Sequence, residues 1–241
     1  DEGVTPDSIT LTCILKACGS LGSLEIGTKI HALIEEKGLL QQDVMLGNTL
    51  VNMYCKFGLI GKAHEILEQF PRRNVASWSA LIAGYAQHGH GKEAFLCFES
   101  MKCEGLLPNT VTYVCILNGC SRMGVISKGR EIHAEIVQEG LLDKSIVVGN
   151  ALVNMYAKAG DLNKAEEVFD GLPYRNVISW TALIAGYAQC KRDEEALNCF
   201  ERMQYSGLPP DGVIWACVLQ ICGNMRAIIK GRAIHMEVVK K

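Results

Sequence analysis

The sequence predicts an all-α protein, built as a solenoid of stacked helical hairpins. The segment at residues 77–87 returns with a single change at residues 179–189, 102 positions later. Apolar residues recur at i, i+3, i+4 and i+7, as in Ala63, Ile66, Leu67 and Phe70. This spacing is typical of a helix buried along one face. No alternating strand pattern is present. A fixed period of helical segments indicates an array in which each repeat buries its apolar face against its neighbours.

Each 102-residue period divides into three hairpins of unequal length, of 36, 31 and 35 residues. The predicted repeats are residues 8–43, 44–74, 75–109, 110–145, 146–176 and 177–211, followed by an incomplete repeat at 212–241. Residues 1–7 end in Pro6-Asp7 and match the tail of a preceding 35-residue repeat.

The positions of glycine and proline predict two helices within each repeat. A first helix is expected to end near Gly58 or Gly160, because glycine readily adopts the left-handed conformation of a helix cap. The second helix carries the apolar stripe and stops at the next proline or glycine. Its stop signals include Pro71, Gly105, Pro173 and Gly207.

The composition sets limits on compartment and partners. With 49% hydrophobic and 21% charged residues, the chain can bury a large core. A net charge of −2 counts against a purely electrostatic nucleic-acid binder, but it allows basic residues to line one face. Eleven cysteines, an odd number, in a helical pattern favour a reducing compartment. No apolar run is long enough to predict a membrane span. The chain opens on Asp1-Glu2 in mid-pattern, without a transit peptide, so both ends are expected to continue in a longer protein.

The motifs resemble those of the PLS class of pentatricopeptide repeat (PPR) proteins, whose P, L and S repeats cycle at about these lengths. Residues 75–87 are similar to the P motif, and residues 47–56 are similar to the S motif. Leu15-Lys16-Ala17-Cys18, with Ile30-His31, is similar to the L motif. By this resemblance, residues 8–43, 110–145 and 212–241 are L repeats, 44–74 and 146–176 are S repeats, and 75–109 and 177–211 are P repeats.

The resemblance implies a right-handed superhelical solenoid that binds single-stranded RNA with one base per repeat. It also implies a plant protein of the plastid or mitochondrion that positions a transcript for C-to-U RNA editing. No cofactor, metal or catalytic residue is expected in this chain. Any deaminase domain would lie outside it.

In the family, the fifth and last residues of a repeat together select the base. The pairs in the S and P repeats are Asn48 with Asn74, Ser79 with Asn109, Asn150 with Asn176, and Thr181 with Asp211. They resemble pyrimidine, adenine, pyrimidine and guanine readers, in that order.

The L repeats follow this rule poorly. Thr12 with Asp43 has the form of a guanine pair, whereas Val114, which is paired with Ser145, cannot form a hydrogen bond through its side chain. Read from 5′ to 3′ along the RNA, the implied target is n-Y-A-n-Y-G.

Two further rows complete the predicted RNA-binding face. The second residue of a repeat flanks the base in the family, and the candidates are Met45, Val111, Val147 and Ile178, with Ala76 as a weaker flank. Helical spacing places residues 5, 9 and 13 of a repeat on one face. An amide suits a base edge and a cation suits phosphate. The phosphate candidates are Lys56, Lys158 and Arg122. On a single helix this pattern also fits an ordinary solvated face, but its recurrence favours binding.

A zinc deaminase site is the main rival chemistry. His133-Ala134-Glu135 has the His-x-Glu form, but the required Pro-Cys-x-x-Cys is absent from the sequence. The cysteines of the L repeats are instead paired as Cys-x4-Cys, which predicts small buried core residues. These pairs are Cys13 with Cys18, Cys115 with Cys120, and Cys217 with Cys222.

Three alternatives stay open. A tetratricopeptide array that grips peptides is disfavoured by the unequal repeat lengths and by the missing Trp-x-x-Leu-Gly start. L repeats could act as a protein-binding scaffold for an accessory editing protein, with the helix near residues 128–140 as the candidate. Uncapped ends could also promote self-association.

Overall fold

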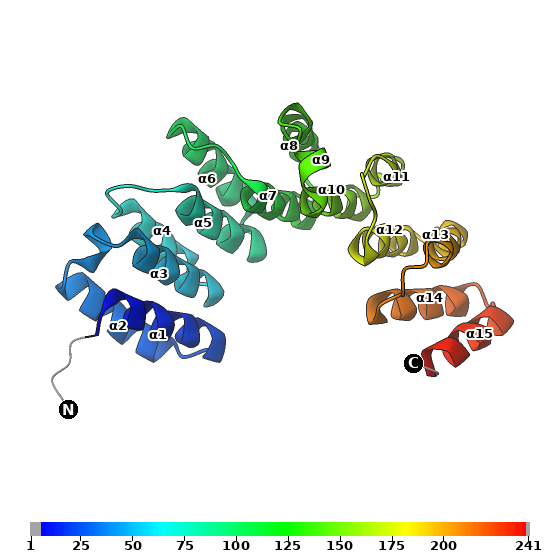
Figure 1. Cartoon of the computed structure of the whole chain (residues 1–241), viewed down its shortest axis with the longest axis horizontal. Coiled ribbons are helices and arrows are strands. Elements are labelled where there is room, and N and C mark those ends of the chain that lie inside the picture. Colours follow the sequence, from blue (N-terminus) through cyan, green and yellow to red (C-terminus); the bar gives the residue numbers. More distant parts are fainter. Residues whose placement is uncertain (1–5, 240–241) are drawn as a thin grey trace. The chain divides into compact units, whose positions relative to one another are not determined.

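The computed structural model describes residues 6–239, except for the side chain of Glu237, and this part of the chain contains helices and no strand. Figure 1 shows the helices as successive hairpins. Those of residues 6–123 are α1 (Ser8–Leu21), α2 (Leu24–Glu36), the short 3-10 helix η1 (Leu39–Gln41), α3 (Val44–Lys56), α4 (Ile60–Glu68), α5 (Val75–Gln87), α6 (Gly91–Cys103) and α7 (Thr110–Met123). They are followed by α8 (Ile126–Gln138), α9 (Leu141–Lys144), α10 (Ile146–Lys158), α11 (Leu162–Asp170), α12 (Val177–Gln189), α13 (Asp193–Tyr205), α14 (Gly212–Asn224) and α15 (Ile228–Val239). The predicted all-α array of hairpins is confirmed.

The first helix of each hairpin begins at the first residue of a predicted repeat. These first helices are α1, α3, α5, α7, α10, α12 and α14. The P, L and S type of each repeat stays a prediction. Most of the predicted tail at residues 1–7 lies outside the described residues, which begin at Pro6.

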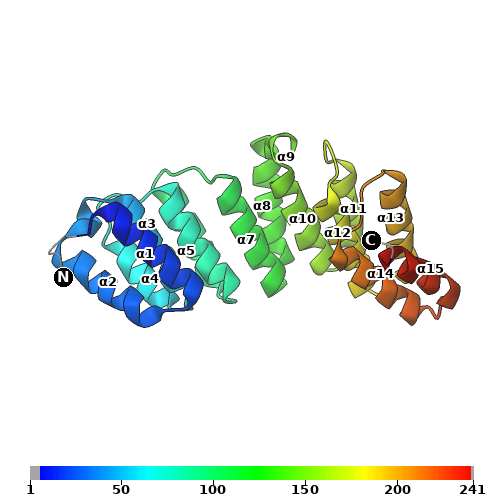
Figure 2. The same ribbon diagram turned by 60° about the horizontal axis from the view of Figure 1, so that its bottom comes forward.

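The chain forms two compact units, Asp1–Arg122 and Met123–Lys241. In the first unit, α3 packs between α1 and α5, and in the second, α12 packs between α10 and α14. The second helices α4 and α6, or α11 and α13, pack against the first helices of their own unit. Figure 2 shows both rows of first helices from another side. Each unit therefore has two layers, with one layer made only of first helices.

Glycine permits the first helices to approach closely. A Cβ atom on Gly186 would lie 2.5 Å from the Cβ of Ala157 on the preceding first helix, which is too close for two carbon atoms. Gly84 meets the side chain of Cys55 in the same way in the first unit. Adjacent first helices are therefore near enough for short polar side chains to meet across them.

The interior is filled by apolar side chains at helical spacing. Trp78, Trp180 and Trp215, which stand at the fourth position of their repeats, are all buried. Because these rings are buried between helices, they are not available for base stacking on the surface.

The cysteines differ in part from the prediction of a uniform core. Cys18, Cys120 and Cys222 are buried, but Cys13 is exposed and Cys115 and Cys217 are half-buried. Five residues along a helix turn two side chains to different faces, which explains the difference within each pair. No helix among the described residues has the length and apolar character needed to cross a membrane.

Candidate nucleic-acid interface

The second residue of each repeat places an exposed apolar side chain at the start of a first helix. The predicted flanking residues Met45, Val111, Val147 and Ile178 are 53–70% exposed. The same row includes Ile9 and Val213, which sequence reasoning did not select and which are also exposed. Isolated exposed apolar residues are common on proteins. A row of them at equivalent positions is unusual, and it offers aliphatic surface to a flat ring.

The fifth residues are recessed, a feature that the sequence analysis did not predict. Thr12, Ser79 and Asn150 are only 5–8% exposed, while Asn48 and Thr181 are half-buried. The close approach of neighbouring first helices encloses these short side chains. A base would have to reach them between the flanking side chains of consecutive repeats.

The last residue of a repeat is the N-cap of the next first helix. Its side-chain oxygen accepts backbone N–H groups, as Asn74 accepts from Ser77, Asn109 from Thr112 and Asn176 from Ser179. Asp43 and Asp211 cap α3 and α14 in the same way. Asn and Asp are strongly preferred at this position because the side chain satisfies an otherwise unpaired N–H. Part of each of these five side chains is therefore already engaged in holding the helix.

Polar contacts link three of the predicted pairs. Asn150 Nδ2 donates to Asn176 Oδ1 over 3.2 Å, which brings that pair into direct contact. Asn48 and Asn74 are joined instead through Ser77, and Ser79 and Asn109 are joined through Thr112. Thr181 is not linked to Asp211, because its hydroxyl donates to the Val177 carbonyl of its own helix. In repeat 110–145, the last residue Ser145 caps α10 without a side-chain hydrogen bond.

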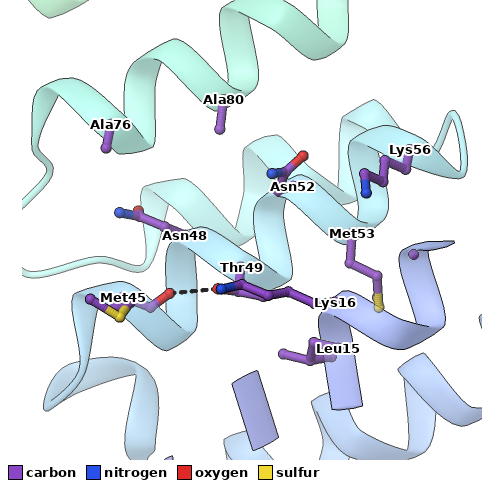
Figure 3. Close-up of a pocket in the computed structure, with 11 residues that line it drawn as sticks. Leu15, Lys16, Met45, Asn48, Thr49, Asn52, Met53, Lys56, Ala76 and Ala80 are labelled. Carbon is purple, nitrogen blue, oxygen red and sulfur yellow. Dashed lines mark hydrogen bonds between the residues drawn. The ribbon is translucent and has the colours of Figure 1, made fainter. Parts of the chain in front are cut away.

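A cavity of about 220 Å³ lies beside Asn48, the fifth residue of repeat 44–74. Its walls come from α1, α3 and α5, and Figure 3 shows Asn48, Asn52 and Lys56 along the same helix. Met45 and Ala76, the second residues of successive repeats, both line it. The cavity is smaller than the ~300–1,000 Å³ typical of small-molecule pockets.

The first helices of both units differ from the second helices in their charged residues. The seven first helices contain no Asp or Glu. Their charged residues are Lys16, Lys56, Arg122 and Lys158, all of which are exposed. Sequence reasoning missed Lys16, which occupies the ninth position of its repeat and lines the cavity. The negative net charge of the chain therefore resides outside the layer of first helices.

One phosphate candidate has a competing contact. Arg122 donates from Nη1 to the carbonyl oxygen of Gln87 over 2.8 Å, at the end of the preceding first helix. Its guanidinium has further N–H groups available. Lys56 and Lys158 stand at the thirteenth position of their repeats.

The junctions behind the first helices contain histidine–tyrosine contacts. His133 Nδ1 and the Tyr156 hydroxyl share a hydrogen bond of 2.9 Å, and His31 and Tyr54 form the same contact in the first unit. Burial lowers the pKa of both histidines. His133 is therefore engaged with a tyrosine. Among the described residues, no group of three or more His, Cys, Asp or Glu side chains could hold a metal ion.

Comparison with known families identifies the repeats. A model of the PPR repeat family matches residues 73–122, and a model of the PPR repeat matches residues 48–75, 111–141, 150–177 and 178–208. The chain belongs to the pentatricopeptide repeat family. It shares 34% identity over 236 residues with a chloroplastic pentatricopeptide repeat-containing protein of Arabidopsis thaliana, covering 98% of this chain and 38% of that protein. A mitochondrial member from the same plant is 32% identical over 231 residues, covering 96% of this chain and 41% of that protein. This PPR chain thus spans about two fifths of the length of these relatives.

Solved structures share the fold. The pentatricopeptide repeat protein PPR10 in complex with an 18-nt psaJ RNA element matches with a TM-score of 0.61 and 18% identity, over 96% of this chain and 40% of PPR10. Nuclear proteinaceous RNase P 2 from A. thaliana matches with a TM-score of 0.52 and 13% identity, over 69% of this chain and 38% of that protein. At these identities the likeness describes the helical-hairpin fold of this PPR chain.

Proposed function

We propose that this PPR chain binds single-stranded RNA along its first helices, with one nucleotide per repeat. The observation that carries the proposal is a recurring set of three features on the first helices. An exposed apolar side chain stands at position 2 of the first helices, and a recessed polar side chain stands at position 5 of α1, α3, α5, α10 and α12. Cations stand on α1, α3, α7 and α10, and none of the first helices contains a carboxylate. The RNA bound to PPR10 supports the same class of ligand.

Each feature has a separate role in such a complex. The aliphatic row provides a nonpolar surface for the faces of unstacked bases, which any base can use. The recessed amides and hydroxyls meet base edges, where hydrogen-bond donors and acceptors distinguish one base from another. The exposed lysines attract phosphates and hold the strand without reading its sequence.

The base choice proposed for each repeat follows the pairs named in the sequence. Asn48 with Asn74 and Asn150 with Asn176 select pyrimidines, Ser79 with Asn109 selects adenine, and Thr181 with Asp211 selects guanine. Thr12 with Asp43 contributes least, because it belongs to an L repeat. The target is n-Y-A-n-Y-G.

We further propose that the longer protein acts in a plastid or mitochondrion as a PLS-class editing factor. The regular 36, 31 and 35-residue cycle supports the class. The chloroplastic and mitochondrial relatives support the compartment. Within this proposal, the chain positions a transcript and carries no catalytic step.

Selection from a randomised single-stranded RNA pool tests the binding function. At one stated salt concentration, enriched sequences are expected to contain Y-A-n-Y-G in one register. Enrichment of no sequence, or of a motif without this spacing, would contradict base-by-base recognition. A double-stranded pool of the same composition is the matched control, and it should give no enrichment.

A second surface favours a protein partner. A groove of about 700 Å³ lies between α8, α10 and α11 in the second unit, on the predicted accessory-protein helix. It contains the exposed Val137 beside Arg130 and Glu167, which is an apolar contact framed by charges of both signs. We propose that an accessory editing protein docks there.

Val137→Asp tests this docking surface, because it places a charge on the apolar contact. The variant should lose co-purification with the accessory protein while keeping its RNA affinity. Unchanged co-purification would exclude this groove. Sedimentation over a range of concentrations would separately reveal self-association of the chain.

A further inference from the structure

Each of three repeats has a buried hydroxyl between its fifth and last residues. The hydroxyl belongs to the third residue of the following repeat, and the three are Ser77, Thr112 and Ser179. All three side chains are fully buried. The sequence motifs singled out the fifth and last residues but assigned no role to this third residue.

The two S repeats have nearly the same geometry. Ser179 Oγ donates to Asn150 Oδ1 over 2.6 Å, and the backbone N–H of Ser179 donates to Asn176 Oδ1 over 2.9 Å. The Asn176 backbone N–H donates back to Ser179 Oγ over 3.2 Å. In the other S repeat, Ser77 Oγ donates to Asn48 Oδ1, also over 2.6 Å. Each of these two serines therefore connects both members of a base-reading pair.

The P repeat 75–109 uses a threonine in the same position. Ser79 Oγ and Thr112 Oγ1 share a hydrogen bond of 2.6 Å, and the Thr112 backbone N–H donates to Asn109 Oδ1 over 3.0 Å. The hydroxyl bridge thus occurs with both an amide and a hydroxyl as the fifth residue.

The other repeats lack this bridge because the third residue of the repeat that follows is aliphatic. These residues are Leu46, Val148 and Ile214. In repeat 177–211 the effect is visible, since the Thr181 hydroxyl turns to a carbonyl of its own helix. The fifth residues therefore fall into two groups, those that are hydrogen-bonded to a hydroxyl of the next repeat and those that are not.

We infer that Ser77, Thr112 and Ser179 are positioning residues that fix which hydrogen-bonding group the fifth residue presents to RNA. This inference rests on the proposed base-by-base function. A serine hydroxyl has one hydrogen to donate. Its oxygen lies closer to the side-chain oxygen of the fifth residue than to that of the last residue, so the hydrogen is donated to the fifth residue. The oxygen of Asn48 or Asn150 is thereby turned inward. The amide N–H groups of Asn48, and the N–H of Asn150 that is not donated to Asn176, remain for an acceptor on the base. Without the bridge, the amide could rotate and present either group.

A purely structural role would give different consequences. An N3 serine that completes a capping box stabilises its helix, and its loss would weaken the binding of every RNA alike. The contact to the preceding repeat goes beyond the cap. Its loss should change base preference at a single nucleotide, while other nucleotides are read as before.

The test compares Ser179→Ala with Ser179→Thr in the full chain. Dissociation constants are measured for two sets of four RNAs, which vary only the nucleotide read by repeat 146–176 or only the nucleotide read by repeat 44–74. Ser179→Ala should reduce the ratio of best to worst affinity at the first nucleotide by about five-fold, the net effect of one hydrogen bond. The ratio at the second nucleotide should stay constant, and Ser179→Thr should restore the first, because Thr112 serves this position naturally.

Ser77→Ala is the matched control, and it should give the reverse pattern. Circular dichroism melting establishes that the variants are folded at the assay temperature. If Ser179→Ala lowers the affinity for all RNAs equally, or changes none, the hydroxyl is only a helix cap and the inference is wrong. If the unchanged chain shows no preference at either nucleotide, the proposed base reading itself fails, and the inference fails with it.

Discussion

At the scale of single residues, the side chains of the predicted reading positions are held by neighbours and are not free in solvent. Asn74 and Asn176 cap helices, and Asn150 is buried against both Asn176 and Ser179. Such fixed groups lose little freedom when they bind, which favours selectivity. Thr181 is the exception, because its hydroxyl is satisfied within its own helix.

Thr181→Asn tests the role of a single reader. The exchange replaces one hydroxyl with an amide, and the preference at its nucleotide should move from guanine toward uracil by about ten-fold, which is within the ~1–3 kcal/mol of one bidentate base contact. Competition binding with four RNAs that differ at that nucleotide measures the shift. An unchanged profile would remove Thr181 and Asp211 from the set of base-reading pairs.

At the scale of helices and their junctions, small departures from the repeat pattern reveal local strain. Most first helices end at a left-handed glycine, such as Gly89 with a φ of 82°. The equivalent residue of the next period is Lys191, which holds a φ of 57°. A residue with a Cβ atom is disfavoured in this conformation.

Lys191→Gly should therefore stabilise the second compact unit. The expected gain in free energy of unfolding is about 1 kcal/mol, the lower end of the cost of a left-handed residue. Urea denaturation measures it, and Gly89→Lys, the reverse exchange in the first unit, should destabilise by a similar amount. A loss of stability in Lys191→Gly would show that the lysine side chain makes a compensating contact.

The His133–Tyr156 junction should make stability depend on pH. Burial lowers the pKa of His133 in the folded protein, so the unfolded chain takes up a proton first as the pH falls. The contribution of His133 to the free energy of unfolding is therefore greatest above the ordinary histidine pKa of about 6.5. It decreases progressively as the pH falls below that value.

His133→Gln isolates this contribution from the titration of carboxylates. Urea denaturation is compared at neutral and mildly acidic pH for the two proteins. The variant should be less stable at neutral pH, and its stability should fall less on acidification. Equal pH dependence in both proteins would mean that His133 is not the responsible group.

At the scale of the whole molecule, the absence of Asp and Glu from the first helices reconciles a net charge of −2 with the proposed RNA binding. The first helices of the two units carry four cations and no carboxylates within their bounds, while Asp7, Asp43 and Asp211 cap α1, α3 and α14. Few phosphates can be neutralised by so few cations. Within the proposed function, most selectivity is therefore expected from the recessed fifth residues and the apolar second residues.

The salt dependence of RNA binding should accordingly be shallow. Four cations predict a slope of log K against log salt no steeper than about −3, at roughly −0.7 per phosphate on a single strand. Lys56→Ala should weaken binding to all sequences alike and reduce the slope by about 0.7. Lys164→Ala, on a second helix, is the matched control and should leave the slope unchanged. A Lys56→Ala slope equal to that of the unchanged chain would mean that this lysine does not contact phosphate.

The sequence by itself determined the fold class, because the helical pattern can be read from residues that are close together in the chain. The 102-residue period and the apolar stripes place the helices, and the first residues of the predicted repeats coincide with the starts of the first helices. The same spacing places residues 2, 5, 9 and 13 on one side of a helix. Even the capping role of Asn74 and Asn176 could have been found from the serine three positions later.

Only the tertiary structure decided how those side chains are presented. The recession of Asn150 and Ser79, and the hydroxyl bridges from Ser179 and Thr112, depend on contact between different repeats. That contact depends on how closely two first helices pack, as at Gly186 against Ala157. Helical periodicity fixes the direction of a side chain around its own axis, but it says nothing about the distance to the next helix. For this reason, the sequence placed these residues on one face of each helix but could not predict that Ser79 and Asn150 are buried and hydrogen-bonded to a neighbouring repeat.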